Sequence, residues 1–209
     1  MTRTDPPLAP VRRAFVLLGR ATRLPEKFLL AVDGEPIVRR EVRLLTEAGL
    51  EVTVVSVLPR DLGGVPVVAD PFDAGPLGGL EVALSRADGP FFLFGGDMPF
   101  LDVAGIRTMQ GEFDGRALVP VGPGGEWEVL HAIYAGVDPR RVEALRREGR
   151  GLKDLVAELD RAGGVRFLPA GAIEPSSFRD VDTAEEYRRL ARDPALGPTG
   201  RRSSDFGGG

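Results

Sequence analysis

The sequence contains no cysteine and a single histidine. Without cysteine there are no disulfide bonds, thiolate metal sites or cysteine nucleophiles, and one histidine cannot build a multi-histidine zinc site. Long hydrophobic runs are missing too: no uninterrupted apolar segment approaches the length of a membrane span, and residues 1–13 lack the apolar centre of a secretory signal. The chemistry left to this chain is that of carboxylates, lysine, arginine and a bound cation, and we expect a cytoplasmic protein.

An excess of positive charge is also absent. The formal net charge is −4, so no chain-wide basic field is available to hold a nucleic-acid backbone. With 209 residues, 43% of them hydrophobic, the chain can bury one sizeable core. We expect a flexible segment over residues 1–13, a single domain over residues 14–193 and a disordered tail over residues 194–209, where little can be buried.

The most informative stretch is a run of four large apolar residues at 91–94, followed by two glycines and Asp97. Such a run suits a strand buried on both faces, and the glycines let the chain turn where the strand ends. Asp97 then lies at the carboxyl end of a strand, where the loops of an open α/β sheet form the ligand crevice. The alternative is that Asp97 only caps the next helix, but Asp102 is better placed for capping and Pro99 lies between them.

Predicted strands alternate with predicted helices along the chain. Because a strand, helix and strand in succession imply a right-handed parallel crossover, the pattern indicates an α/β sheet. Apolar and β-branched runs predict strands at residues 14–18, 51–57, 65–69, 91–94, 117–120, 129–134 and 165–168. Helical spacing of apolar residues predicts helices at 38–48, 77–84 and 152–159, and a last one with Tyr187 and Leu190 on its core face.

The loop after the first predicted strand carries three basic side chains, Arg20, Arg23 and Lys27. Arginine makes forked contacts to phosphate oxygens and lysine supplies a compact charge, so the loop suits a polyphosphate. It is neither a P-loop nor a dinucleotide fingerprint, and an ordinary solvated loop is the alternative.

A second loop runs from Asp70 through Gly75 into a helix with Gly78 and Gly79 in its first turn. Glycine at a helical position costs about 1 kcal/mol, which makes sense if a flat ligand must approach the backbone. The alternative is helix packing, in which the glycines admit a neighbouring element.

Two further polar residues also have structural alternatives. His131 is a candidate for contact with substrate, yet a lone histidine in an apolar strand is more often a hydrogen-bonded core residue. Asp182 precedes the last helix, where Thr183 and Glu186 form a capping-box pattern, so capping competes with a ligand role.

Taken in order, these motifs resemble the molybdenum cofactor guanylyltransferase (MobA-like) family of nucleotidyltransferases. The motifs are the basic loop, Gly-Pro-Leu-Gly-Gly at 75–79 and Gly-Asp-Met-Pro-Phe-Leu at 96–101. Segments 129–134 and 180–187 are similar to the family's later strand and its carboxy-terminal motif. The resemblance covers about residues 14–191. It implies a three-layer α/β/α, Rossmann-like nucleotidyltransferase (GT-A-like) fold with a mostly parallel mixed sheet.

The resemblance also implies site residues. The implied nucleotide-binding residues are Leu17, Gly19, Arg23, Lys27, Asp70, Gly75, Gly79 and Asp97. Among these, Arg23, Lys27 and Asp97 are the implied catalytic residues, and Asp97 would hold Mg²⁺. Asp180 and Asp182 would face the second substrate; related cytidylyl-transferring members more often have aspartates at these two positions.

The reaction implied by the resemblance transfers GMP from GTP to molybdopterin with release of pyrophosphate. GTP and molybdopterin are then the partners, and we expect neither nucleic acid nor membrane binding. We expect a monomer or weak oligomer that contacts molybdoenzyme assembly proteins transiently.

The sequence departs from the family pattern at two places in the triphosphate loop. Leu18 stands where the family has the first glycine of a pair, and a longer family motif is shortened to Leu24-Pro25-Glu26-Lys27. These departures keep open a catalytically impaired nucleotide-binding module. Asp180 and Asp182 keep open cytidylyl transfer to the same pterin, and nucleotidyl transfer to a sugar phosphate or isoprenoid precursor is a third alternative.

Overall fold

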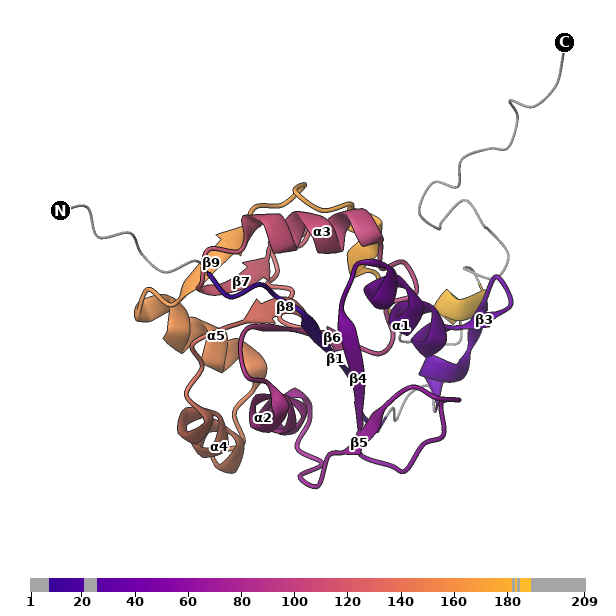
Figure 1. Cartoon of the computed structure of the whole chain (residues 1–209), viewed down its shortest axis with the longest axis horizontal. Helices are drawn as coiled ribbons and strands as arrows, with labels where there is room; N and C mark the ends of the chain where they lie inside the picture. The colour runs from indigo at the N-terminus through magenta and orange to yellow at the C-terminus, as the bar shows by residue number, and fades with distance from the viewer. Residues whose placement is uncertain (1–7, 21–25, 182, 184, 189–209) are drawn as a thin grey trace, which may run out of the picture.

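A seven-stranded mixed sheet forms the centre of the protein (Figure 1). The computed structural model describes residues 8–20, 26–181, 183 and 185–188. The strands of the sheet are β1 (Arg13–Leu18), β4 (Glu51–Ser56), β5 (Val67–Ala69), β6 (Phe91–Gly95), β7 (Ala117–Pro120), β8 (His131–Tyr134) and β9 (Val165–Leu168). Their order is β5-β4-β1-β6-β8-β7-β9, and only β8 runs antiparallel to its neighbours. The prediction of a mostly parallel mixed sheet is confirmed.

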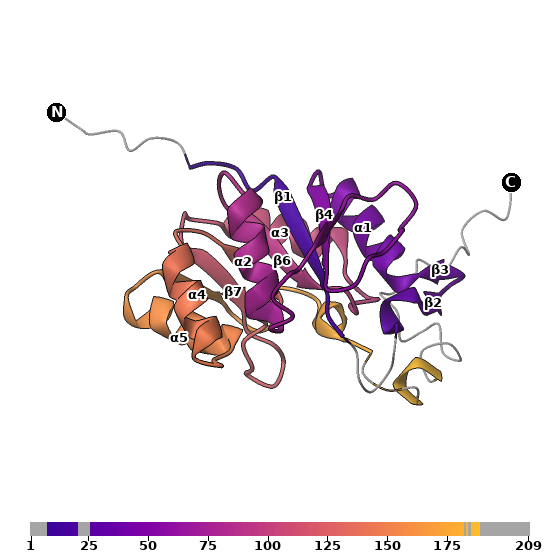
Figure 2. The ribbon, with the colours of Figure 1, turned by 90° about the horizontal axis from the view of Figure 1, so that it is seen from below.

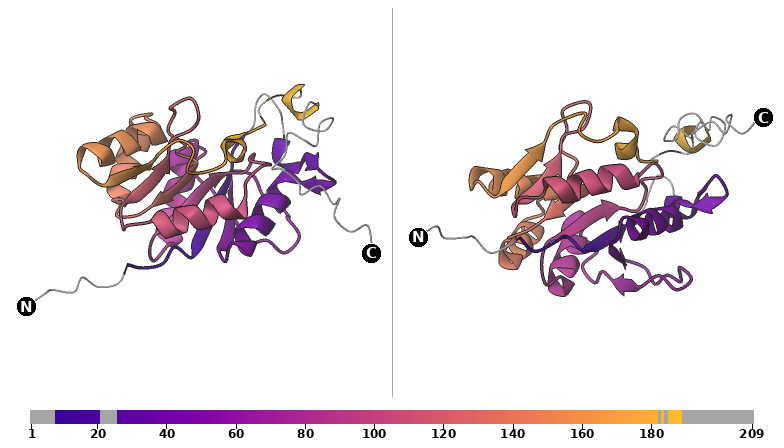
Figure 3. Two further views of the ribbon diagram at one scale, coloured as in Figure 1. Left: turned by 90° about the horizontal axis from the view of Figure 1, so that it is seen from above. Right: turned by 45° about the horizontal axis from the view of Figure 1, so that its top comes forward.

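Helices cover both faces of this sheet, as predicted for a three-layer fold. One face carries α1 (Ile37–Glu47) and α3 (Val103–Glu112), which lie in front of the sheet in the left view of Figure 3. The other face carries α2 (Pro76–Arg86), α4 (Pro139–Arg147) and α5 (Leu152–Arg161) (Figure 2). Each helical layer encloses its own hydrophobic core cluster against the sheet. Helix α4 was not predicted, because most of its residues are charged and few apolar positions mark its period.

Strand β6 lies near the middle of the sheet, between β1 and β8. All five of its residues are buried, and Phe94 pairs with Val16 of β1. Burial of each large apolar side chain contributes roughly 1.5–3 kcal/mol, so this run fixes the strand firmly. Because β1, β4 and β6 are parallel, the residues that follow them emerge at one edge of the sheet.

A short hairpin precedes α1. It consists of β2 (Ala31–Val32) and β3 (Glu35–Pro36). Its turn residues Asp33 and Gly34 have φ of 53° and 80°, the left-handed conformation that suits an Asp-Gly hairpin turn. Val32 packs with Ile37 and Val181 in a third, small core cluster.

The packed part of the chain begins before residue 14. Val11 is buried in the core, and Arg13 is already the first residue of β1. The end of the segment expected to be flexible therefore belongs to the fold. Residues 1–7 and the expected tail at 194–209 lie outside the described residues. No helix within the described ranges has the length and apolarity needed to cross a bilayer.

His131 is a core residue and does not line the cavity described below. Its ring makes edge contacts with Phe94 and Phe178, with 5.0 Å between ring centroids in each pair. Neither ring nitrogen has a hydrogen-bond partner among the described residues, so the expected hydrogen bond is absent. Burial lowers the pKa of His131 from 6.5 to about 3, and Asp102 only partly opposes this.

This buried histidine predicts an acid-sensitive fold. Between pH 6.5 and pH 3 the unfolded chain binds a proton at His131 while the folded chain does not, so the free energy of unfolding falls as the pH falls. The expected contribution is a loss of about 2 kcal/mol between pH 7.5 and pH 5. Denaturant unfolding at these pH values should show a smaller loss for His131→Leu. Equal losses for both proteins would contradict the prediction.

Candidate active site

A cavity of about 370 Å³ opens at the carboxyl edge of β1, β4 and β6. This volume lies within the range of small-ligand sites. Three loops far apart in the sequence meet there: the loop after β1, the loop between β5 and α2, and the loop after β6. The cavity is lined by seven of the eight predicted nucleotide-binding residues: Leu17, Gly19, Lys27, Asp70, Gly75, Gly79 and Asp97. The eighth, Arg23, lies outside the described residues.

Asp97 and Lys27 meet inside this cavity from opposite loops. Lys27 Nζ forms an ion pair with Asp97 Oδ2, and the two side chains are 17% and 21% exposed, so water reaches both only partly. Asp97 is not the cap of α3. Asp102 has that role, since its Oδ1 accepts a hydrogen bond from the Gly105 N–H at 2.8 Å. Asp97 therefore has no capping role, and it forms part of the cavity wall.

The backbone of the Asp97 loop is tied to neighbouring segments. The Gly96 N–H donates to the Leu17 carbonyl at 3.0 Å, and the Val181 N–H donates to the Asp97 carbonyl at 3.2 Å. The second bond brings Asp180, the adjacent residue, next to this loop. Asp182 lies outside the described residues.

Glu128 lies near Asp180 and was not predicted as a site residue. Burial raises the pKa of Glu128 to about 7, and the nearby carboxylates of Glu126 and Asp180 act in the same direction. No spacing in the sequence indicated this neighbourhood, because the loop before β8 and the segment after residue 178 meet only in the fold. The positive charge of Lys153 acts in the opposite direction, so the side of the site predicted to face the second substrate carries several carboxylates and one lysine.

The capping box predicted for the last helix is present. The Thr183 N–H donates to Glu186 Oε2 at 2.8 Å, and the Glu186 N–H donates to Thr183 Oγ1 at 3.2 Å. Thr183 therefore caps this helix, and residues 185–188 are helical.

Asp70 also lines the cavity and is largely buried. Its Oδ1 accepts a hydrogen bond from the Phe72 N–H at 2.8 Å, which shapes the loop leading into α2. Farther along this loop, Asp73 Oδ2 pairs with Arg20 Nε at 2.7 Å. Arg20 and Asp73 both line the cavity, so this ion pair joins the loop after β1 to the loop before α2.

The glycines before and within α2 have distinct structural reasons. Gly75 has φ 63° and ψ −155°, a conformation essentially restricted to glycine. At Gly79, a Cβ atom would lie 2.7 Å from both Leu17 methyl carbons. The helix-packing alternative therefore holds for Gly79, which admits Leu17. Leu17 in turn forms part of the cavity wall.

Gly79→Ala is expected to lower nucleotide affinity about fivefold, or roughly 1 kcal/mol, because Leu17 must move and the cavity changes shape. The fold should survive, since the clashing atoms are the end of a flexible side chain. Gly111→Ala in α3 is the matched control: nothing lies within 4 Å of its added methyl group, so it should only stabilise the helix. Calorimetric titration with GTP measures both. Equal affinities for the two variants would contradict the prediction.

Glu41 is a polar residue near the site that the sequence analysis missed. It lies on α1, is fully buried, and its Oε1 accepts a hydrogen bond from the Met98 N–H. Burial raises the pKa of Glu41 well above its usual value and the Asp97 carboxylate adds to this, while the Met98 N–H opposes it. A signal existed: Glu41 stands three residues after Val38 and four before Leu45, in the buried stripe of α1.

The side chains at the cavity fit a magnesium ion. Mg²⁺ prefers oxygen ligands, and it commonly uses one or two carboxylates together with substrate phosphates and water. Asp97 offers such a carboxylate inside the cavity. Over the described part of the chain, no group of three or more acidic or histidine side chains is arranged to hold a metal. The site therefore suits a cation that arrives with a phosphate-bearing ligand.

Solved structures share this fold. A molybdopterin-guanine dinucleotide biosynthesis protein A from Archaeoglobus fulgidus superposes with a TM-score of 0.70 at 21% identity, over 86% of this chain and 97% of that one. A nucleotidyl transferase from Methanothermobacter superposes with a TM-score of 0.66 at 19% identity, over 88% of this chain and 96% of that one. The predicted nucleotidyltransferase fold is confirmed.

The protein is a nucleotidyltransferase. It belongs to the MobA-like NTP transferase family, because the model of that domain matches residues 15–162. A protein from Pyrococcus furiosus, named probable molybdenum cofactor guanylyltransferase, is 36% identical over 79% of this chain and 88% of its own length. A protein of the same name from Thermococcus kodakarensis is 30% identical over 82% and 90%. The family resemblance inferred from the motifs is confirmed.

Proposed function

We propose that this protein is a Mg²⁺-dependent guanylyltransferase that transfers GMP from GTP to molybdopterin and releases pyrophosphate. The observation that carries the proposal is the convergence of seven predicted nucleotide-binding residues on one cavity, with Lys27 and Asp97 paired inside it. The names of the relatives support the guanylyl group and the molybdenum cofactor precursor as acceptor.

In the proposed reaction, a terminal phosphate oxygen of molybdopterin attacks the α-phosphorus of GTP. The new P–O bond forms as the bond to the pyrophosphate oxygen breaks. Such a transfer requires alignment of the reactants and neutralisation of the growing charge, with little need for a covalent protein nucleophile. Bound Mg²⁺ would supply Lewis-acid stabilisation of the phosphate oxygens.

Lys27 and Asp97 have complementary electrostatic roles in the proposed reaction. In the structure they neutralise each other. On binding of the nucleotide and its cation, the ammonium group of Lys27 would turn to the phosphate oxygens and the carboxylate of Asp97 would hold the cation. Each charge would exchange one opposite charge for another, so that neither group would be left unpaired. Arg23, which precedes Lys27 in the same loop, is proposed to share in neutralising the pyrophosphate.

The remaining residues shape the two substrate sides. Gly75 keeps a side chain away from the backbone at the start of α2, where base and ribose are proposed to lie, and Gly79 makes room for Leu17, which forms part of the cavity wall there. Asp180 and Asp182 are proposed to face the pterin. Leu18, which departs from the family pattern, lines the cavity but is only 4% exposed, because its side chain packs in the core cluster beneath α1 and α3.

Pyrophosphate release tests the proposal. The purified protein is incubated with Mg²⁺, molybdopterin and each nucleoside triphosphate in turn. We expect release with GTP, and only when the acceptor is present. A preference for CTP would contradict the guanylyl assignment, and release with a sugar phosphate but not with molybdopterin would contradict the acceptor. Tight nucleotide binding without release under any acceptor would show a non-catalytic module.

A further inference from the structure

The loop that carries Asp97 is held from α1 by two adjacent side chains. Arg40 Nε donates a hydrogen bond to the Pro99 carbonyl at 3.0 Å. Glu41 Oε1 accepts a hydrogen bond from the Met98 N–H. These contacts fall one and two residues after Asp97, so α1 fixes the backbone immediately beyond the proposed metal ligand.

The backbone of Gly96 and Asp97, just before these two contacts, is also hydrogen-bonded. The Gly96 N–H bonds to the Leu17 carbonyl and the Asp97 carbonyl accepts from the Val181 N–H. With the backbone bonded at four successive residues, the direction of the Asp97 carboxylate is left to its own short side chain. Loss of a contact from α1 would free the backbone after Asp97, at Met98 or Pro99, while the bonds at Gly96 and Asp97 would remain.

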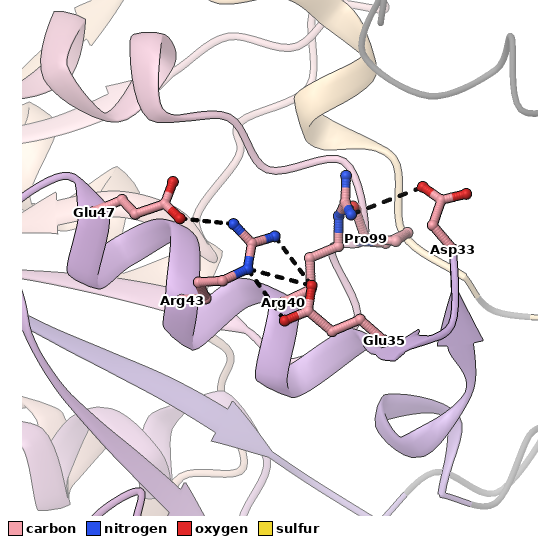
Figure 4. Close-up of polar contacts among 6 residues, drawn as sticks. All are labelled: Asp33, Glu35, Arg40, Arg43, Glu47 and Pro99. Carbon is pink, nitrogen blue, oxygen red and sulfur yellow. Dashed lines mark hydrogen bonds and ion pairs between the residues drawn. The ribbon is translucent and has the colours of Figure 1, made fainter.

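Arg40 also links the loop to the hairpin before α1. Its Nη1 lies 3.8 Å from Asp33 Oδ2 in the hairpin turn, while its Nε reaches Pro99 (Figure 4). The Arg40 side chain is only 17% exposed. Its guanidinium group is thus oriented by partners on two separate segments, which suits a residue that fixes a loop.

Arg43, one turn farther along α1, provides a contrast. It pairs with Glu35 at 3.0 Å and with Glu47 at 2.8 Å, and its side chain is 44% exposed (Figure 4). Both of these partners belong to β3 or α1 itself. Arg43 therefore takes part in a surface ion-pair network and has no hydrogen bond to the loop.

Glu41 occupies a position where an apolar side chain would serve the core better. Its side chain is fully buried, and its Oε2 has no hydrogen-bond partner among the described residues. Burying a polar oxygen without a partner is unfavourable. Core stability therefore does not explain a carboxyl group here, whereas its contact with the Met98 N–H gives it a role at the loop.

We infer that Arg40 and Glu41 are positioning residues that orient Asp97 toward the cation accompanying the nucleotide. Neither residue lines the cavity, so both act through the backbone of Met98 and Pro99. The inference rests on the proposed function, in which Asp97 holds that cation. Groups that orient a metal ligand commonly change metal affinity about 10–100-fold when they are removed.

The test is calorimetric titration of GTP, with and without Mn²⁺ and without acceptor. Wild-type protein should bind GTP more tightly with Mn²⁺, and Asp97→Asn should remove this enhancement. Arg40→Met and Glu41→Leu should each reduce the enhancement about tenfold and leave metal-free affinity within about twofold. Glu41→Gln should retain most of the enhancement, because its amide oxygen can accept from the Met98 N–H. Arg43→Met, the matched control, should behave as wild type.

The outcomes separate the inference from the function on which it rests. Full enhancement in both Arg40→Met and Glu41→Leu, with loss in Asp97→Asn, would overturn the inference alone. Equal losses of metal-free and Mn²⁺-supported affinity would also overturn it, because they indicate a general structural role. Absence of any Mn²⁺ enhancement in the wild type would overturn both. Thermal melts identify a variant that fails to fold. If Arg40→Met or Glu41→Leu does not fold, the Mn²⁺ enhancement of the other variant tests the inference.

Discussion

Asp97→Asn is expected to slow pyrophosphate release about a thousandfold or more. Asparagine keeps the size of the side chain but removes the charge that holds the cation in the proposed mechanism. Since each tenfold change in rate corresponds to about 1.4 kcal/mol, the predicted loss is roughly 4 kcal/mol, which is in keeping with the several kcal/mol that a bound metal supplies. Initial rates with GTP, molybdopterin and saturating Mg²⁺ measure the effect.

The fold gives a clear expectation for the stability of this variant. Asp102, rather than Asp97, caps α3, and the Asp97 loop is held through its backbone. The melting temperature should therefore stay close to that of the wild type. Asp160→Asn, which changes an exposed carboxylate on α5, is the control and should retain wild-type rates. Near-normal turnover by Asp97→Asn would show that Asp97 does not hold the metal.

Lys27→Met is expected to lower turnover about a hundredfold, the second largest effect predicted here. Removing a charge aimed at the developing transition-state charge typically costs about 3–4 kcal/mol when the site is shielded from water, and somewhat less at the partial exposure of Lys27. Its side chain is 17% exposed and already lies beside Asp97. Methionine keeps the apolar stem of lysine, so the loss isolates the ammonium group.

Lys27→Met also distinguishes direct contact with GTP from structural support of the site. KM for GTP should rise more than KM for molybdopterin, because the ammonium group is proposed to contact the triphosphate. Arg147→Met is the control, since Arg147 is an exposed cation on α4 that does not line the cavity. Equal rises in both KM values would indicate that Lys27 supports the site without contacting GTP.

The central strand and the residue that follows it were predictable from the sequence. Four apolar residues at 91–94 leave few alternatives to a strand buried on both faces, and the two glycines after it end that strand. The alternation of strands and helices also predicts that β1 and β6 run parallel, and their pairing in the sheet brings Gly19 and Asp97 to the same edge. Local pattern and chain topology point to the same answer here.

Contacts between segments that are distant in the sequence could not be predicted from it. The pairing of Lys27 with Asp97 joins two residues that are 70 positions apart in the sequence, and no local pattern specifies such a contact. The same holds for the hydrogen bond between Val181 and Asp97, which joins two segments that are far apart in the sequence. Strand β8 runs antiparallel because its connection to β7 returns directly, a feature that apolar periodicity does not encode.

Glu41 is a third case: the sequence shows that the residue is unusual but does not show what it contacts. An acidic residue in the apolar stripe of α1 breaks the helical pattern, yet the pattern alone does not identify the Met98 N–H as its partner. Departures from a binary pattern are expected where a fold serves a site rather than its own stability.

The most direct test of the account is the position of a metal ion in crystals grown with GTP and Mn²⁺. Anomalous scattering from Mn²⁺ locates the ion independently of the protein. We expect a peak within coordination distance of an Asp97 carboxylate oxygen, with phosphate oxygens completing the shell and Lys27 turned from Asp97 to the triphosphate. A nucleotide bound in this cavity with its Mn²⁺ away from Asp97, or one bound outside the cavity, would contradict it.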